Sequence, residues 1–372
     1  MRGKPAHESP LCLDCHAPGP QEAARRGRDF DQSFGVGCEA CHGAAGDWLN
    51  PHTTAAWQAR GWQAADGEFK AGLGMVATKV LATRAAMCAT CHIGEPGREV
   101  NHDLIAAGHP RLAFEFSSHH LRLPKHWRER RTATDPRPRD RDIHPDWDLR
   151  AWAVGQVVAT RAACELVAHH AASSDSERSL QPAWPELADF DCAGCHQPVR
   201  LPAVPSRAES AKTAGLLIAS DWYVSVVPSA IAHFTRDQSA GQAVRQLTSR
   251  LSQADASAMS VAEAARKAVA SLNSQERPLV SAAMDVTAAR RLLRDLASPA
   301  DGTIITRDHA TQIVLALQAV QRTIHEQRPS PADVVIEQRL RELSVATTTM
   351  PGVPFQPSAF ASQLKRLSEM IE

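Results

Sequence analysis

The chain has little that would tie it to a membrane or to nucleic acid. No run of apolar residues in its 372 residues approaches the roughly 20 that a membrane-spanning helix requires. Lysine plus arginine equal aspartate plus glutamate, at 41 each, so the formal net charge is zero. A neutral chain gives no support for nucleic acid or an anionic membrane as a general partner. We therefore expect a protein that has no membrane span and does not bind nucleic acid.

Three further absences narrow the chemistry. The first residues, Met1-Arg2-Gly3-Lys4-Pro5, include none of the apolar stretch that marks a signal peptide. Tyrosine occurs once, as Tyr223. No cysteine follows Cys195, so any chemistry that needs thiols is confined to the N-terminal half of the chain.

The five-residue sequence Cys-x-x-Cys-His occurs four times and accounts for eight of the nine cysteines. This spacing is typical of c-type haem attachment, in which two thiols add to the haem vinyl groups and the adjacent histidine binds the iron. The sequence therefore predicts four covalently bound haem c groups. The predicted thioether residues are Cys12, Cys15, Cys38, Cys41, Cys88, Cys91, Cys192 and Cys195, and the predicted proximal ligands are His16, His42, His92 and His196.

Two other uses of Cys-x-x-Cys fit the pattern less well. Repeated pairs also bind structural zinc, and the gap from Cys15 to Cys38 is only slightly long for a zinc ribbon. Zinc, however, gives no reason for a histidine directly after every second cysteine. A redox-active dithiol would occur once, on a βαβ scaffold, and no such scaffold is visible. The ninth cysteine, Cys164, lies on the apolar side of a helical run, and we interpret it as a small buried hydrophobic residue.

Haem attachment places the protein outside the cytoplasm. Haem is joined to Cys-x-x-Cys-His after export, in an oxidising compartment. We therefore expect a periplasmic or extracellular protein, although the chain begins without a signal peptide. A mature form, a trimmed chain or a gene start placed too late would reconcile the two observations.

The haem motifs all lie within residues 12–196, which predicts a tetrahaem domain over residues 1–200. This stretch is rich in Gly, Pro, His and Trp and has few periodic segments. We expect extensive loops and short helices that end at each proximal histidine, wrapped around stacked haems. One longer helix is predicted over residues 148–171, and the charged, proline-containing residues 128–142 are interpreted as a solvated loop.

Three prolines within residues 197–205 predict a boundary, and residues 206–372 are predicted to form an α-helical domain of unknown role. About six helices are expected there, with breaks near Asp237, Asn273, Pro299, Pro329 and Met350. Ser260 with Glu263 predicts a capping box, and Ser330 predicts a helix N-cap. The fold class is therefore mainly α, with a haem-bearing domain followed by a helical bundle.

Thirteen histidines remain as candidates for the sixth coordination position of the irons. His52 and His102 each follow a motif by ten residues, and His109 lies between a glycine and a proline that would fix its approach. These three are the predicted distal ligands. Weaker candidates are His7, His119, His120, His126, His169 and His170, whereas His144, His233, His309 and His325 are interpreted as structural or exposed. Arg111 could pair with a haem propionate, although a surface arginine is the default interpretation.

Four segments resemble the multihaem cytochromes related to the tetrahaem cytochrome c-554 of ammonia oxidation. They are Leu11–His16, Gly35–Gly43, His102–Leu112 and Trp184–His196, all within the first 200 residues. The resemblance implies an electron carrier with closely stacked, largely bis-histidine haems, in which His52 and His109 match distal positions. Members of the family usually carry more sequence before the first motif, so by this resemblance we expect one iron to lack a distal ligand that the family supplies from there.

The leading hypothesis for function is electron transfer between redox proteins as donor and acceptor. The alternative is an oxidoreductase that acts on a small nitrogen or sulfur species at one haem with an open coordination position. Every motif ends in histidine, and the single tyrosine lies outside the haem region, which by resemblance argues against tyrosine-linked catalytic haems. A third hypothesis, compatible with the first, is a subunit docked through its helical half to a membrane or surface complex.

Overall fold

The regular secondary structure of the computed structural model is helical. The structure describes residues 5–19, 26–60, 66–124, 145–173, 184–196, 217–235, 237–298, 305–348 and 355–371. Within these ranges the only extended pairings are two isolated bridges, Glu95 with Arg98 and Phe190 with Ala219. None of the helices described is long and apolar enough to cross a membrane. The prediction of a mainly α protein with a helical C-terminal region is confirmed.

The chain packs as two compact units, Met1–Glu99 and Val100–Glu372. In the first unit, short helices alternate with loops. Three of its helices end on a predicted proximal histidine, as the sequence analysis expected. The helices are α1 (Pro10–His16), α2 (Cys38–His42), α3 (Ala55–Arg60), α4 (Asp66–Gly72) and α5 (Leu81–His92), with short 3₁₀ turns at Ala6–Glu8, Gln32–Phe34 and Pro51–Thr53.

The side-chain core of the first unit is small. Among its described residues eight apolar side chains are buried, and four of them are alanine. The larger four are Leu13, Trp48, Leu81 and Ile93. Six large apolar residues of this unit are exposed: Leu11, Phe34, Val36, Leu49, Phe69 and Val80. A domain of this size normally gains its stability by burying well over half of its chain's surface, so this unit has apolar surface left for a further apolar body to cover.

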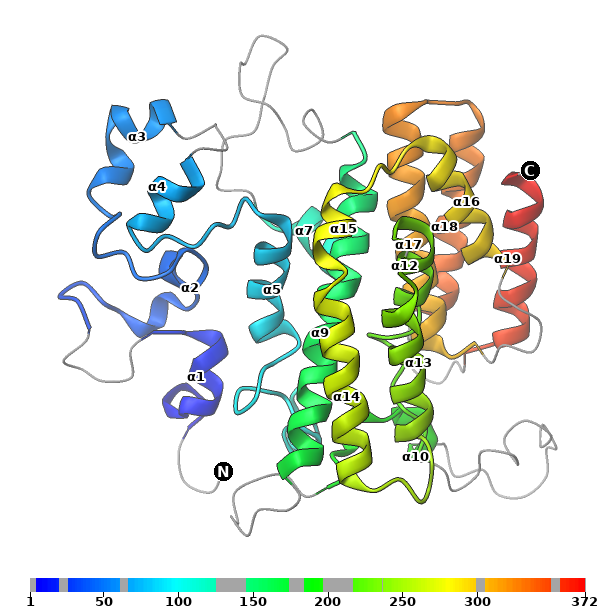
Figure 1. The fold of residues 1–372 in the computed structure, drawn as a ribbon, viewed down its shortest axis with the longest axis horizontal. Coiled ribbons are helices and arrows are strands. Elements are labelled where there is room, and N and C mark those ends of the chain that lie inside the picture. Colours follow the sequence, from blue (N-terminus) through cyan, green and yellow to red (C-terminus); the bar gives the residue numbers. More distant parts are fainter. Residues whose placement is uncertain are drawn as a thin grey trace. The chain divides into compact units, whose positions relative to one another are not determined.

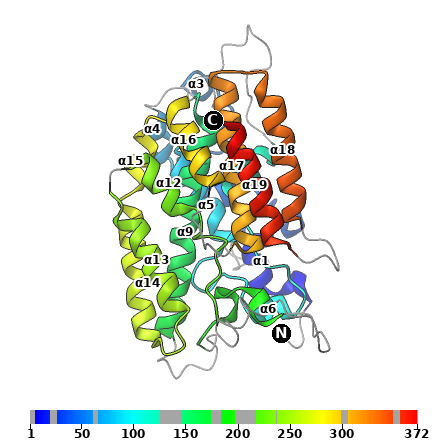
Figure 2. The ribbon, with the colours of Figure 1, turned by 90° about the vertical axis from the view of Figure 1, so that its right-hand side faces the viewer.

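The second unit is built around one long helix, α9 (Trp147–Ser173), close to the predicted 148–171. Its side chains are buried around most of the helix, from Leu149 and Trp152 to Val157 and Val158, so it needs cover on every side. That cover comes from α14, α17, α15, α12 and α7. Figure 1 shows α14 alongside α9, and Figure 2 shows α17, α18 and α19 as neighbouring helices.

The remaining elements of the second unit precede and follow α9. They are α6 (His102–Ala106), α7 (Phe116–Arg122), a 3₁₀ turn at Leu187–Asp189, α10 (Cys192–Cys195), α12 (Val227–Phe234), α13 (Ser239–Leu251), α14 (Ala258–Asn273), α15 (Glu276–Ser281), α16 (Val286–Ala297), α17 (Arg307–Gln327), α18 (Ala332–Thr347) and α19 (Pro357–Ile371).

The two compact units divide between Glu99 and Val100, whereas the domain boundary predicted near residue 200 lies outside the described residues. The described C-terminal helices pack against α9 and share its core.

The described C-terminal region has eight helices where about six were predicted. Of the five predicted breaks, those at Asp237 and Pro329 fall between helices, Asn273 is the last residue of α14, and Pro299 and Met350 lie outside the described residues. Two further breaks, at residues 252–257 and 282–285, were missed, and neither contains glycine or proline.

The predicted helix caps lie a few residues from the observed ones. At the start of α14 the Ser257 side chain, not that of Ser260, accepts the capping hydrogen bond, from the Ser260 N–H. The N-cap of α18 is Pro331 and not the predicted Ser330, although the Ser330 hydroxyl accepts a hydrogen bond from the Ala332 N–H at 3.3 Å.

Gly155 provides a test of the packing of α9. A Cβ atom at this position would lie 2.7 Å from the Cβ of Phe116, which is 2% exposed on α7. We expect Gly155→Ala to lower the free energy of unfolding by about 1–3 kcal/mol, because the crossing of α7 and α9 must open. Urea denaturation followed by circular dichroism measures the change.

Gly241 on α13 is the matched control, because its Cβ would meet Pro228 Cα at 3.4 Å, an ordinary contact. Gly241→Ala should leave the unfolding free energy unchanged or raise it by about 0.5–1 kcal/mol. Equal effects of the two substitutions would contradict the close crossing.

Candidate functional site

Each Cys-x-x-Cys pair lies on one turn of helix. The first three motifs end α1, α2 and α5, and the fourth forms α10, where the His196 N–H continues the helix by donating to Cys192 O at 2.8 Å. Residues three apart share a helix face, so the two thiols of a pair point the same way and the histidine follows one step on. All nine cysteines are free thiols. This is the arrangement that attachment of one planar group at two points requires.

The second motif is closed by a glycine that no other residue could replace without strain. Gly43 has φ +78°, and a Cβ there would lie 2.9 Å from Gly74 O. Val76, two residues after Gly74, donates its N–H to His42 O at 3.0 Å. The Gly that ends the string Gly-Cys-Glu-Ala-Cys-His-Gly thus lets a second segment pack directly behind His42.

The structure brings together thiols from the three motifs of the first unit. The Cys15 thiol donates a hydrogen bond to Cys91, which lowers the pKa of Cys91 to about 6 and raises that of Cys15. Burial and, to a smaller extent, the neighbouring Cys41 raise the pKa of Cys88 to about 11. The pKa of Cys41 is itself raised, by burial first and then by Cys91. Motifs separated by up to 76 residues in sequence therefore converge in one unit.

In the second unit, His102 lies beside the histidine of the fourth motif. The rings of His102 and His196 are 6.3 Å apart between centroids, with 28° between their planes. His102 begins α6, where its N–H donates to Glu186 Oε1 at 2.8 Å. The fourth motif is tied to residues 218–220, since the Asp191 N–H donates to Ile218 O at 2.8 Å. A predicted distal ligand and a predicted proximal ligand, 94 residues apart, are thus neighbours.

His52 lies close to its own motif, on the other side of a tryptophan. The ring of the buried Trp48 is 6.2 Å from that of His42 and 5.9 Å from that of His52. The Nδ1 of His52 pairs with Leu49 O. Beside it, a cavity of about 440 Å³ is lined by Asn50, Pro51, Thr54, Ala56, Trp57 and Phe69.

His109 follows a left-handed glycine, Gly108 with φ +109°, which turns the chain after α6. Its Nδ1 lies 2.7 Å from Pro110 O, so the ring donates a hydrogen bond there. Arg111, in contrast, forms an ion pair with Asp308 and lies over the Trp222 ring at 5.6 Å. Its side chain is 35% exposed, so Arg111 is partly buried and not simply the surface arginine of the default interpretation.

The weaker histidine candidates differ in burial. His170 is 4% exposed, and its Nδ1 is 2.8 Å from Asp189 Oδ2, three residues before Cys192. A carboxylate on one ring nitrogen is the usual companion of a metal-binding histidine, but equally of a buried structural one. His120 is 5% exposed between Phe116 and Trp147, whereas His7 is exposed. His126 and His144 lie outside the described residues.

The remaining histidines and Cys164 fit their structural interpretation. His233 and His325 pair with Asp295 and Asp333 on the C-terminal helices. Cys164 is 1% exposed, and burial raises the pKa of its thiol to about 12. The prediction of a buried hydrophobic cysteine is confirmed.

The residues present suit covalent haem. Eight free thiols are arranged in pairs on single helical turns, each followed by a histidine. The first unit buries few side chains and leaves apolar ones exposed. The indole N–H of Trp48 is buried and has no acceptor among the described residues. Within the same residues, no group of three or more His, Cys, Asp or Glu side chains is placed to hold a metal ion by itself.

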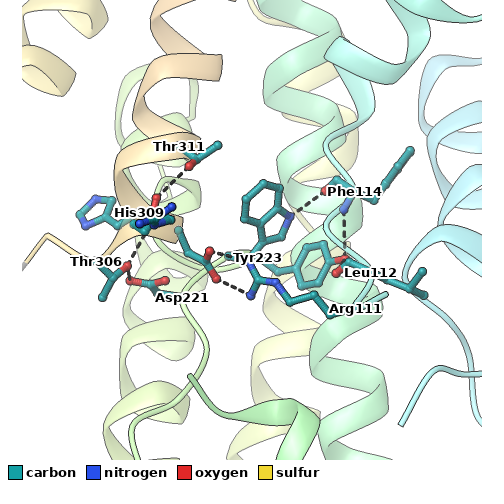
Figure 3. A network of polar contacts seen from close by, with 11 residues as sticks. Arg111, Leu112, Phe114, Asp221, Tyr223, Thr306, His309 and Thr311 are labelled. Atoms are coloured by element: carbon teal, nitrogen blue, oxygen red, sulfur yellow. Dashed lines mark hydrogen bonds and ion pairs between the residues drawn. The ribbon is translucent and has the colours of Figure 1, made fainter. Parts of the chain in front are cut away.

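Sequence reasoning missed a polar network around Tyr223, shown in Figure 3. The Tyr223 hydroxyl donates to Leu112 O at 3.0 Å, and the Phe114 N–H donates to the same hydroxyl at 3.3 Å. Asp221 accepts a hydrogen bond from the Thr306 hydroxyl at 2.6 Å. Burial raises the pKa of Asp221 to about 6. The signal available in the sequence was the single tyrosine, which lies outside every haem motif.

A protein-family model described as "Cytochrome c554 and c-prime" matches residues 1–43. No curated protein and no solved structure matches the chain. The matched segment includes the first two Cys-x-x-Cys-His motifs and is 43 of the 372 residues. The N-terminal segment is therefore similar to a c-type cytochrome, which indicates covalent haem and a role in electron transfer.

The raised pKa of Asp221 predicts a pH-dependent stability. An aspartate has a pKa of about 3.9 when unfolded and here about 6 when folded, so the folded protein binds the extra proton between those values. The contribution of protonated Asp221 to the free energy of unfolding is complete below pH 4 and is lost as the pH rises through 6. The change in free energy is at most about 3 kcal/mol. We expect Asp221→Asn to remove this loss.

The measurement is the difference in unfolding free energy between Asp221→Asn and the parent protein from pH 4 to pH 7. The difference should grow in favour of the variant as the pH rises. A difference that stays constant with pH would show that Asp221 titrates normally.

Proposed function

We propose that the protein is a tetrahaem c-type cytochrome that relays single electrons between redox proteins. The observation that carries the proposal is the set of four Cys-x-x-Cys-His motifs, each with both thiols free on one helical turn. The family match over residues 1–43 supports the first two motifs, and the small core of the first unit supports a bound apolar group there.

The residues of this chain have three tasks in the proposed function. The cysteine pairs anchor each haem by two thioether bonds, and His16, His42, His92 and His196 bind the irons on the proximal side. A haem so held supplies one-electron redox chemistry. His102, by its contact with His196, is assigned as the distal ligand of the fourth haem. His52 and His109 are assigned as distal ligands of other haems.

The same chemistry suggests where the protein works and what it contacts. Thioether attachment takes place after export, so we propose a periplasmic or extracellular protein. Two strong axial ligands leave no position for a substrate, so the partners are a redox protein that donates electrons and one that accepts them. The buried Tyr223 hydroxyl is engaged with residues 112 and 114.

The number of haems can be counted directly. The chain is expressed in an exporting host with haem-attachment enzymes. Its mass, measured by mass spectrometry, should increase by that of four haems, and a pyridine haemochrome assay should give about four haems per chain. Replacing both cysteines of one motif by serine should remove one haem, because each motif anchors one. Cys164→Ser is the control and should remove none. A protein that binds zinc instead, or gains fewer than four haems, would contradict the proposal.

The assignment of His102 can be tested by spectroscopy. We expect His102→Ala to open the fourth iron, so that about one haem in four becomes high-spin and binds carbon monoxide. Added imidazole should restore the low-spin spectrum by filling the position. His325→Ala, which removes an exposed histidine on α17, should leave the spectrum unchanged. A low-spin spectrum in His102→Ala would exclude this histidine as a ligand.

A further inference from the structure

The segment that follows His109 is held at the start of α17. Arg111, two residues after His109, makes a bidentate pair with Asp308, with Nη1 2.6 Å from Oδ2 and Nη2 on Oδ1. The pair is mostly buried, since the Arg111 side chain is 35% exposed and that of Asp308 13%. Asp308 lies in the first turn of the helix, where the dipole favours a carboxylate. Because two of its nitrogens bind the carboxylate, the planar guanidinium of Arg111 is fixed in direction as well as in distance from Asp308.

The main chain beyond Arg111 is held as well. The Tyr223 hydroxyl bridges Leu112 O and the Phe114 N–H, and the Trp222 indole N–H donates to Phe114 O at 3.0 Å. The Trp222 ring also lies under the guanidinium of Arg111. Residues 111–114 thus have both their side-chain charge and their backbone groups fixed by partners from distant parts of the sequence.

These two sets of partners are joined to each other. The Thr306 hydroxyl, which accepts the capping hydrogen bond from the His309 N–H, donates to Asp221 at 2.6 Å. Residues 221–223 and the start of α17 therefore form one frame, visible in Figure 3. All of its members belong to the second unit. None of the hydrogen bonds of the frame comes from a Cys-x-x-Cys-His residue, although Cys192 of the fourth motif is near enough to Arg111 to interact with its charge.

We propose that this frame is a positioning device for the axial histidine His109, with Asp308 acting through Arg111. The inference rests on the proposed function, in which His109 binds a haem iron. We call the ion pair of Arg111 with Asp308 the clamp. Only Pro110 lies between His109 and Arg111, and proline transmits the direction of the chain because its φ angle is fixed. The start of α17 would thereby help to set the direction of the His109 ring.

A matched pair of variants tests the proposal. Asp308→Ala removes the clamp on Arg111. Asp148→Ala removes a comparable ion pair, since Asp148 is also an acid in the first turn of a helix, α9, and pairs with Arg322 at 3.0 Å. Both substitutions leave a partly buried arginine without its carboxylate, so their costs in stability should be similar. Only the first should disturb His109.

The readouts are the haem spectra and the midpoint potentials of the fully haem-loaded protein, recorded where circular dichroism shows that it is folded. In His109→Ala we expect about one haem in four to become high-spin and to bind carbon monoxide. In Asp308→Ala a fraction of that same haem should do so, and its potential should shift, whereas Asp148→Ala should match the parent protein. Arg111→Lys keeps the charge but not the bidentate geometry and should fall between the two.

The outcomes separate the clamp from the ligand. If His109→Ala changes the spectrum but Asp308→Ala and Arg111→Lys do not, the positioning role is wrong and the ligand assignment stands. If Asp308→Ala and Asp148→Ala have equal effects, the ion pair acts only on stability and the proposal is overturned. An unchanged spectrum in His109→Ala would overturn both the ligand assignment and the clamp. Should Asp308→Ala fail to fold, Arg111→Lys carries the same comparison.

Discussion

The scarcity of buried side chains in residues 5–99 constrains the whole N-terminal unit. Four alanines with Leu13, Trp48, Leu81 and Ile93 form its described core, while phenylalanine and valine side chains remain exposed. Such a segment gains little from the burial of its own side chains. Three of its short helices, α1, α2 and α5, carry a cysteine pair and a histidine. In the proposed cytochrome, the haems supply the missing apolar volume, and haem attachment and folding of this unit depend on each other.

The second unit follows the opposite principle. The helix α9 is buried around most of its circumference, and the C-terminal helices provide much of its cover. In the same unit the His102 N–H donates to Glu186 and the Asp191 N–H, next to the fourth Cys-x-x-Cys-His motif, donates to Ile218 O. A helical region with no Cys-x-x-Cys-His motif of its own therefore belongs to the same unit as the predicted ligands His102, His109 and His196.

The chemistry of the site was predictable from the sequence and its geometry was not. Local spacing places two thiols and a histidine on one helical turn wherever the motif occurs, because the helical repeat alone decides it. The long helix was likewise local, set by apolar periodicity. The missed breaks at residues 252–257 and 282–285 contain neither glycine nor proline, but each ends in a side chain, Ser257 or Asp285, that caps the next helix. The boundary predicted near residue 200 lies outside the described residues and stays a prediction.

By itself, the sequence determined the number and kind of haem-attachment motifs, the helical class of the fold and the set of histidines from which axial ligands come. Only the tertiary structure decided which of these residues are neighbours. His102 meets His196 across 94 residues, Cys15 meets Cys91 across 76, and Arg111 finds Asp308 across 197. Such pairs leave no periodic or compositional trace, because each arises from the packing of whole helices and not from the spacing of residues along one of them.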